Sequence, residues 1–186
     1  HTKAICSKLS KNLYLLRCVK NIVPTWAMRD LFFAYINNNI TYGLSIWGPM
    51  CLSRDFDRVR VLHKKGLRVL GNVSSHAPTN PIVKKYKILK LDDIVDLELS
   101  KFGYRLTHNI LPGPVLNLFN RGADYHQYNT RNRDNPVVSR HKYALFHKSF
   151  LCRTPVIWGE LPASLKESKS LGYFNSKFKK LKLDGY

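Results

Sequence analysis

The sequence predicts a mainly α-helical protein, because apolar side chains recur at helical spacing and stretches rich in proline or glycine separate segments of helix length. Its 186 residues suffice for one large domain or two small ones. Hydrophobic residues make up 44% of the chain, which is normal for a folded protein and too high for a disordered one. We therefore expect a helical bundle followed by a mixed, partly irregular region that ends in an amphipathic helix.

The first two helical stretches are predicted within residues 4–47. The first stretch, 4–20, carries an apolar stripe at helical spacing: Ile5, Leu9, Leu13 and Leu16. The second opens after Pro24, with Trp26 among its apolar residues and an interruption at 37–39. We expect Gly48 and Pro49 to end it, because both residues break helices.

The third stretch, 53–70, has the clearest helix signals. Ser53 is a favourable N-cap, the acidic residues that follow suit the first turn, and Gly71 suits the position after the last turn. One face is predicted to be buried: Phe56, Val59, Leu62, Gly66 and Leu70. Basic side chains gather on the opposite face: Arg54, Arg58, Lys65 and Arg68, with Lys64 beside them.

Residues 73–119 are predicted to form a helical connector, and 120–186 a basic C-terminal extension. The connector has a short helix that begins at Asn80 and Pro81, and a longer one that begins at Asp92 or Asp93. In the extension, 120–135 is turn-rich, and 137–158 suits either short strands or irregular helix. Ser170 is expected to cap a last helix with three apolar side chains inward: Phe174, Phe178 and Leu181.

Charge is the strongest functional signal in the chain. There are 31 Lys and Arg against 12 Asp and Glu, a formal net charge of +19. Residues 1–91 alone hold 16 basic and 3 acidic side chains, a net of +13. A folded core with this much self-repulsion is typical of a protein that binds a polyanion, and nucleic acid is the first candidate. An anionic membrane surface is the weaker one.

Two groups of residues are the candidate nucleic-acid contacts. The first is the basic face of 53–70, defined above as Arg54, Arg58, Lys64, Lys65 and Arg68; the alternative is a merely solvated surface. The second is Tyr128, Arg131 and Arg133, in a segment that alternates aromatic, amide and basic side chains. That mixture suits stacking on bases and binding phosphates, and a polar surface loop is an equally good interpretation.

No catalytic residue, metal ligand or cofactor is predicted. Asp92 and Asp93 resemble the adjacent carboxylates that hold Mg²⁺ in polymerases, yet they precede a helical stripe and suit a helix N-terminus. His141, His147 and Cys152 match no zinc spacing, and free thiols are the better interpretation of the four cysteines. Neither a signal peptide nor a transmembrane segment is predicted, so we expect an intracellular protein, nuclear or cytoplasmic, without a membrane partner.

Several short segments together resemble reverse transcriptases of non-LTR retrotransposons, in the region after the palm, and jockey-like LINE elements in particular. These segments are 8–16, 42–48, 63–70, 84–91, 128–131 and 158–162. His63 stands where the family has Gln. Gly66 stands where it has Ala, a change that costs about 1 kcal/mol of local helix stability.

The resemblance implies that 1–72 is a thumb-like helical region that grips the primer–template of an RNA-directed DNA polymerase, without catalysis of its own. The fingers and palm, with the catalytic Asp residues, are then expected before His1, as partners of this region. The alternative is a stand-alone basic RNA- or DNA-binding or assembly protein, derived from such an element and reused by a host. A third interpretation, an enzyme of another type, finds no site in the sequence.

Overall fold

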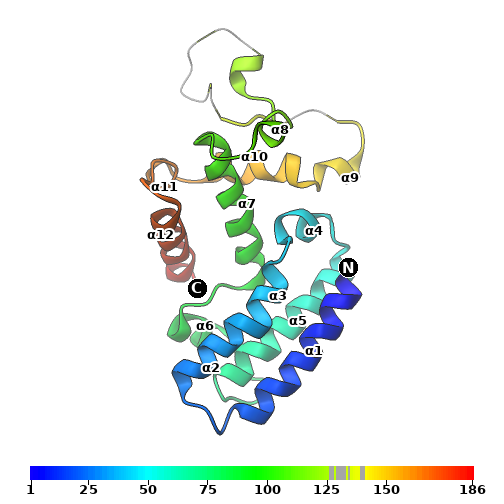
Figure 1. Ribbon diagram of the computed structural model, residues 1–186, viewed down its shortest axis with the longest axis vertical. Helices are drawn as coiled ribbons and strands as arrows, with labels where there is room; N and C mark the ends of the chain where they lie inside the picture. Colours follow the sequence, from blue (N-terminus) through cyan, green and yellow to red (C-terminus); the bar gives the residue numbers. More distant parts are fainter. Residues whose placement is uncertain (126–127, 129–132, 134, 139–140) are drawn as a thin grey trace. The chain divides into compact units, whose positions relative to one another are not determined.

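The computed structural model is mainly helical, as predicted (Figure 1). It describes residues 1–125, 128, 133, 135–138 and 141–186. Two compact units are present: the first comprises His1–Ile94 with Leu181–Tyr186, and the second comprises Val95–Lys180. The predicted connector, 73–119, is therefore divided between the two units. Among the described residues, no helix combines the length and apolar character needed to cross a membrane.

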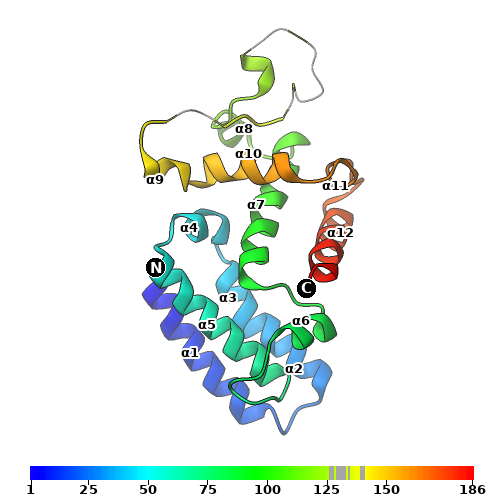
Figure 2. The same ribbon diagram turned by 180° about the vertical axis from the view of Figure 1, so that it is seen from behind.

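The first unit is built on two long helices that lie side by side, α1 (Thr2–Val19) and α5 (Ser53–Leu70), as both ribbon views show (Figures 1 and 2). The predicted apolar stripe of α1 is confirmed, because all four of its side chains are buried: Ile5, Leu9, Leu13 and Leu16. α1 packs against α5. The packing of this pair therefore fixes which face of α5 remains exposed.

The chain between α1 and α5 continues through helix where an interruption was expected. α2 (Thr25–Phe32) runs into a π-helical turn, η1 (Phe33–Asn37), and then into α3 (Asn38–Thr41). The Tyr35 carbonyl in that turn accepts hydrogen bonds from the amides of Asn12 at 2.7 Å and Asn39 at 2.6 Å. The prediction of a break at 37–39 was therefore wrong, because an asparagine side chain there supports the widened turn.

Two further details of this region differ from the prediction. Gly48 and Pro49 lie inside α4 (Leu44–Met50), which ends one residue after the proline. Trp26, expected among the apolar side chains of the helix, is 71% exposed. The buried side of α2 and η1 is instead formed by Met28, Phe32 and Ile36.

α5 has the predicted length, with a buried face shifted from the predicted one. Ser53 is its first residue rather than an N-cap with a side-chain hydrogen bond, and Gly71 follows it with ordinary right-handed dihedrals. Asn72, at φ 49°, takes the left-handed conformation. The buried positions are Val59, His63, Gly66, Leu67 and Leu70, while Phe56 and Leu62 are half-buried. His63 therefore lies near the centre of the packed face.

Gly66 permits the close approach of α5 to the preceding helices. A Cβ at this position would lie 3.0 Å from Phe32 Cε2 and 3.5 Å from the side chain of Ile36. Such a contact requires the Phe32 ring to move by a few tenths of an ångström. The glycine costs helix propensity, and the tight packing around it offsets that cost.

The first unit closes with α6 (Asn80–Tyr86), the start of α7 (Leu91–Thr107) and the C-terminal residues. The Tyr186 hydroxyl donates a hydrogen bond to the Asp93 carboxylate and accepts one from the Lys90 amide at 3.1 Å. Lys182 Nζ lies 2.9 Å from the same carboxylate. Burial, and secondarily this hydrogen bond, raises the pKa of the Tyr186 phenol well above its ordinary value.

The second unit holds the rest of α7 with α8 (Gly113–Leu116), the 3-10 turn η2 (Gly122–Asp124), α9 (Ala144–His147), α10 (Phe150–Glu160), α11 (Ala163–Lys166) and most of α12 (Leu171–Asp184). The described residues of 137–158 thus include helices, and the alternative of short strands is not observed there. Gly103 lies against Trp158, where a Cβ would come within 2.8 Å of the indole.

The last helix follows the prediction in part. Ser170 Oγ accepts a hydrogen bond from the Tyr173 amide at 3.2 Å, as expected of an N-cap. Phe174 and Phe178 are fully buried, as predicted. Leu181, predicted inward, is 49% exposed.

The shifted face of α5 gives a matched pair of substitutions. Leu70→Ala is expected to lower the free energy of unfolding by about 2–5 kcal/mol, because Leu70 is buried to 4% exposure. Leu62→Ala is expected to cost less than half of the Leu70 loss, because Leu62 keeps part of its surface in water. Urea denaturation of both variants measures the difference, and equal losses would contradict the helix orientation described here.

Candidate nucleic-acid interface

The five predicted basic residues of α5 lie outside its buried positions. Arg54, Arg58, Lys64 and Lys65 are exposed, and Arg68 is half-buried. The arginine side chains of Arg54 and Arg58 are 78% and 57% exposed. Because the opposite face of α5 is packed against the core, these cations project into solvent from one surface. This basic face of α5 is the strongest candidate site in the first unit.

One carboxylate contacts two members of the basic face. Asp55 Oδ1 is 3.5 Å from Arg58 Nη1 and 3.9 Å from Arg54 Nε. Surface pairs with this geometry contribute at most about 1 kcal/mol and are screened by salt. The two guanidinium groups therefore remain available to an external anion, which competes with Asp55 for them.

The remaining members of the basic face differ in their surroundings. Arg68 Nε donates a hydrogen bond to the Ala77 carbonyl at 2.9 Å, so this side chain holds the connector that follows α5. Lys64 and Lys65 make no ion pair or hydrogen bond with any described residue. Arg68 is therefore partly a structural residue, whereas the two lysines have ammonium groups free for a ligand.

Tyr128 and Arg133, from the second predicted group, belong to the second compact unit. Tyr128 is 79% exposed, and Arg133 is half-buried. Arg131 lies outside the described residues. The role of these three residues in binding therefore stays a prediction.

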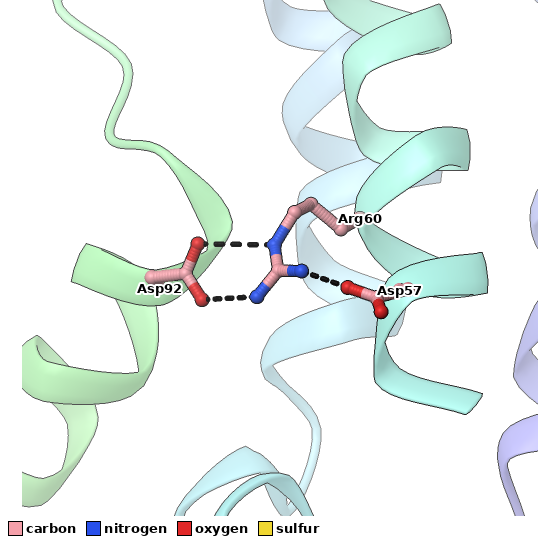
Figure 3. Close-up of polar contacts among 3 residues, drawn as sticks. All are labelled: Asp57, Arg60 and Asp92. Carbon is pink, nitrogen blue, oxygen red and sulfur yellow. Dashed lines mark hydrogen bonds and ion pairs between the residues drawn. The ribbon is translucent and has the colours of Figure 1, made fainter. Parts of the chain in front are cut away.

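Next to the basic face, an ion-pair bridge ties α5 to the start of α7 (Figure 3). Arg60 donates to the Asp92 carboxylate through Nε at 3.1 Å and Nη2 at 2.7 Å, and also contacts Asp57 one turn earlier. The hydrogen bonds to Asp92 raise the pKa of Arg60. Sequence reasoning assigned Asp92 only to the start of a helix, because its partner is 32 residues away.

Beside this bridge lies a cavity of about 150 Å³ within the first unit. Its lining includes Arg60, His63, Lys64, Lys90 and Asp92. His63 is only 1% exposed, and its Nε2 is buried without a hydrogen-bond partner. Burial lowers the pKa of His63 to about 4, with Asp92 opposing the shift and Lys64 adding to it.

The described residues offer little to catalysis. Asp92 and Asp93 occupy the first turn of α7. Asp92 pairs with Arg60, and Asp93 contacts Tyr186 and Lys182. Burial raises the pKa of the Cys6 and Cys51 thiols, which disfavours the nucleophilic thiolate. No group of three potential metal ligands is found in the described part of the chain.

His63 gives the first unit a pH-dependent stability. In the folded state its pKa is about 4, below its ordinary value of 6.5, so the unfolded chain binds a proton that the folded chain resists. The free energy of unfolding is therefore expected to fall as pH drops from about 7 to about 4, by about 3 kcal/mol from this group alone. Urea denaturation of the protein and of His63→Gln across this range measures that share; equal pH dependence in both would contradict it.

No protein-family model, curated protein or solved structure matches this chain significantly. The geometry and charge of the chain's own residues are therefore the guide to its function. The basic face of α5 combines exposure, a packed opposite side and two lysines without ion-pair partners among the described residues.

Proposed function

We propose that this chain is a nucleic-acid-binding helical module that grips the phosphate backbone through the basic face of α5, without catalysis of its own. The observation that carries the proposal is the row of exposed cations on one side of α5, with Lys64 and Lys65 unpaired among the described residues, in a chain of net charge +19. A duplex carries one negative charge per about 1.7 Å of axis, so a row of cations along one helix face can meet several phosphates.

The proposed context is the thumb of a non-LTR retrotransposon reverse transcriptase, from the resemblance described above. In that context the module would hold primer and template for a palm supplied elsewhere in the polymerase. The helical architecture and the carboxylates occupied by partners at the start of α7 agree with a binding role. A stand-alone basic binding protein reused by a host is the alternative, and both share the same binding surface.

Binding is expected to be largely electrostatic and weakly dependent on sequence. If about five phosphates are neutralised, log affinity falls against log salt with a slope of roughly −4 to −5 on duplex, and less steeply on single strands. Fluorescence anisotropy with labelled duplexes of unrelated sequence, measured over a salt series, gives the slope. A salt-independent affinity would exclude a phosphate grip.

A triple substitution locates the grip. Arg54→Gln, Arg58→Gln and Lys65→Gln together are expected to flatten the salt slope by about three units, because each removes one phosphate contact. Arg68 is left in place because it holds the connector at Ala77. The matched control removes three exposed charges from α1, through Lys3→Gln, Lys11→Gln and Arg17→Gln. Melting curves verify that both variants fold, and an equal effect of the two triples would contradict a local grip on α5.

The isolated chain is expected to have no polymerase activity, because its adjacent aspartates are engaged by Arg60, Tyr186 and Lys182. Primer extension on a homopolymer template with Mg²⁺ or Mn²⁺ measures this. Templated synthesis by the purified chain that is lost in Asp92→Asn with Asp93→Asn would overturn the assignment of a binding role alone.

A further inference from the structure

The cavity beside α5 contains an unexplained buried polar atom. His63 Nε2 has no hydrogen-bond partner, and the ring is 1% exposed. An unpaired buried nitrogen costs about 1–3 kcal/mol relative to a bonded one. In native proteins such atoms are commonly satisfied by a bound water or ligand. The His63 residue also lines a cavity of about 150 Å³, so an occupant of the cavity would lie next to this residue.

The charges around this cavity favour an anion. Three cationic side chains line it, against one carboxylate. Arg60 is shared between Asp57 and Asp92, so its charge is compensated. Lys64 and Lys90 pair with no carboxylate among the described residues, and Lys90 Nζ is held 4.2 Å from the centre of the Tyr186 ring. When Asp57 is counted with the lining, three cations face two carboxylates, so the surroundings of the cavity remain net positive.

The remaining lining suits an oxyanion of limited size. Thr79 adds a hydroxyl group, which donates one hydrogen bond, to the donors that the ammonium groups supply. A cavity near 150 Å³ holds a ligand about as large as benzene, so one phosphate group fits where a whole nucleotide does not. A phosphate linked on one side enters such a cavity more readily than a phosphodiester linked on two.

We propose that the cavity lined by His63, Lys64, Thr79 and Lys90 binds one terminal phosphate group, either on a small phosphomonoester or at the end of a nucleic-acid strand. Lys64 and Lys90 supply the charge, and His63 and Thr79 supply neutral hydrogen-bonding groups. The site shares Lys64 with the basic face of α5, and its other lining residues lie outside that face.

Inorganic phosphate is the first probe. Added to the full chain at constant ionic strength, it is expected to shift the assigned ring resonances of His63 saturably, with chloride as the control anion. Lys64→Gln is expected to weaken this binding about tenfold, the effect of one lost charge-assisted hydrogen bond. Lys65→Gln is the matched control, because Lys65 is the next residue, is also exposed and does not line the cavity. Unchanged His63 resonances, or equal losses in the two variants, would show that the cavity holds only water.

Oligonucleotides then distinguish the sources of the phosphate. The site is assigned to a strand end if a duplex with 5′-phosphates binds more tightly than the same duplex with 5′-hydroxyls. This preference must be abolished by Lys64→Gln and kept by Lys65→Gln. Equal affinity of the two duplexes, together with saturable phosphate binding, assigns it to a small phosphomonoester. The phosphate titration needs no nucleic acid, so saturable phosphate binding supports the cavity site even if the chain does not bind duplexes. If duplexes bind but the His63 resonances do not respond to phosphate, the cavity proposal is wrong and the proposed grip on α5 is unaffected.

Discussion

The packing of α5 against α1 and η1 is the constraint on which the first unit depends. α5 buries Val59, Leu67 and Leu70 on one side, and Gly66 lets the Phe32 ring approach closely. In an amphipathic helix the apolar stripe packs against the core, and the opposite side is therefore exposed to solvent. The exposed row of cations is therefore a consequence of the apolar interface and cannot be moved without rebuilding the core.

This arrangement separates two uses of positive charge. On the outer face, Arg54, Arg58 and Lys65 lie in water, where attraction to an anion is long-ranged and sensitive to salt. At the edge of the same helix, Arg60 is committed to Asp57 and Asp92 and so ties α5 to the start of α7. Similar side chains thus serve binding at one position and architecture at another, according to their neighbours.

The sequence predicted the elements better than their details. The stripe of α1 and the inward Phe174 and Phe178 followed from spacing alone, because their apolar character and helical period agree. The predicted buried face of α5 differs from the observed one because His63 is polar and was not included in the apolar stripe. In the structure His63 lies near the centre of the buried face. A break was expected at 37–39 because the local sequence does not indicate that Asn12, in another helix, donates a hydrogen bond to the Tyr35 carbonyl.

The candidate site was predictable only where its residues lie on a single helix. The exposed cations of α5 belong to one helix, so their periodicity placed them together. The cavity joins residues 60–67, 79–80 and 90–92, which only the tertiary structure brings into proximity. Arg68 also donates a hydrogen bond to the Ala77 carbonyl, which lies in an irregular connector that helical periodicity does not describe.

Lysine footprinting tests the central claim most directly. Acetylation of the full chain, with and without saturating duplex, reports the reactivity of each ammonium group by mass spectrometry. If the basic face of α5 is the grip, Lys65 becomes protected while Lys3 and Lys11 on α1, exposed to the same solvent, keep their reactivity. Protection of the α1 lysines with Lys65 still reactive would contradict the account.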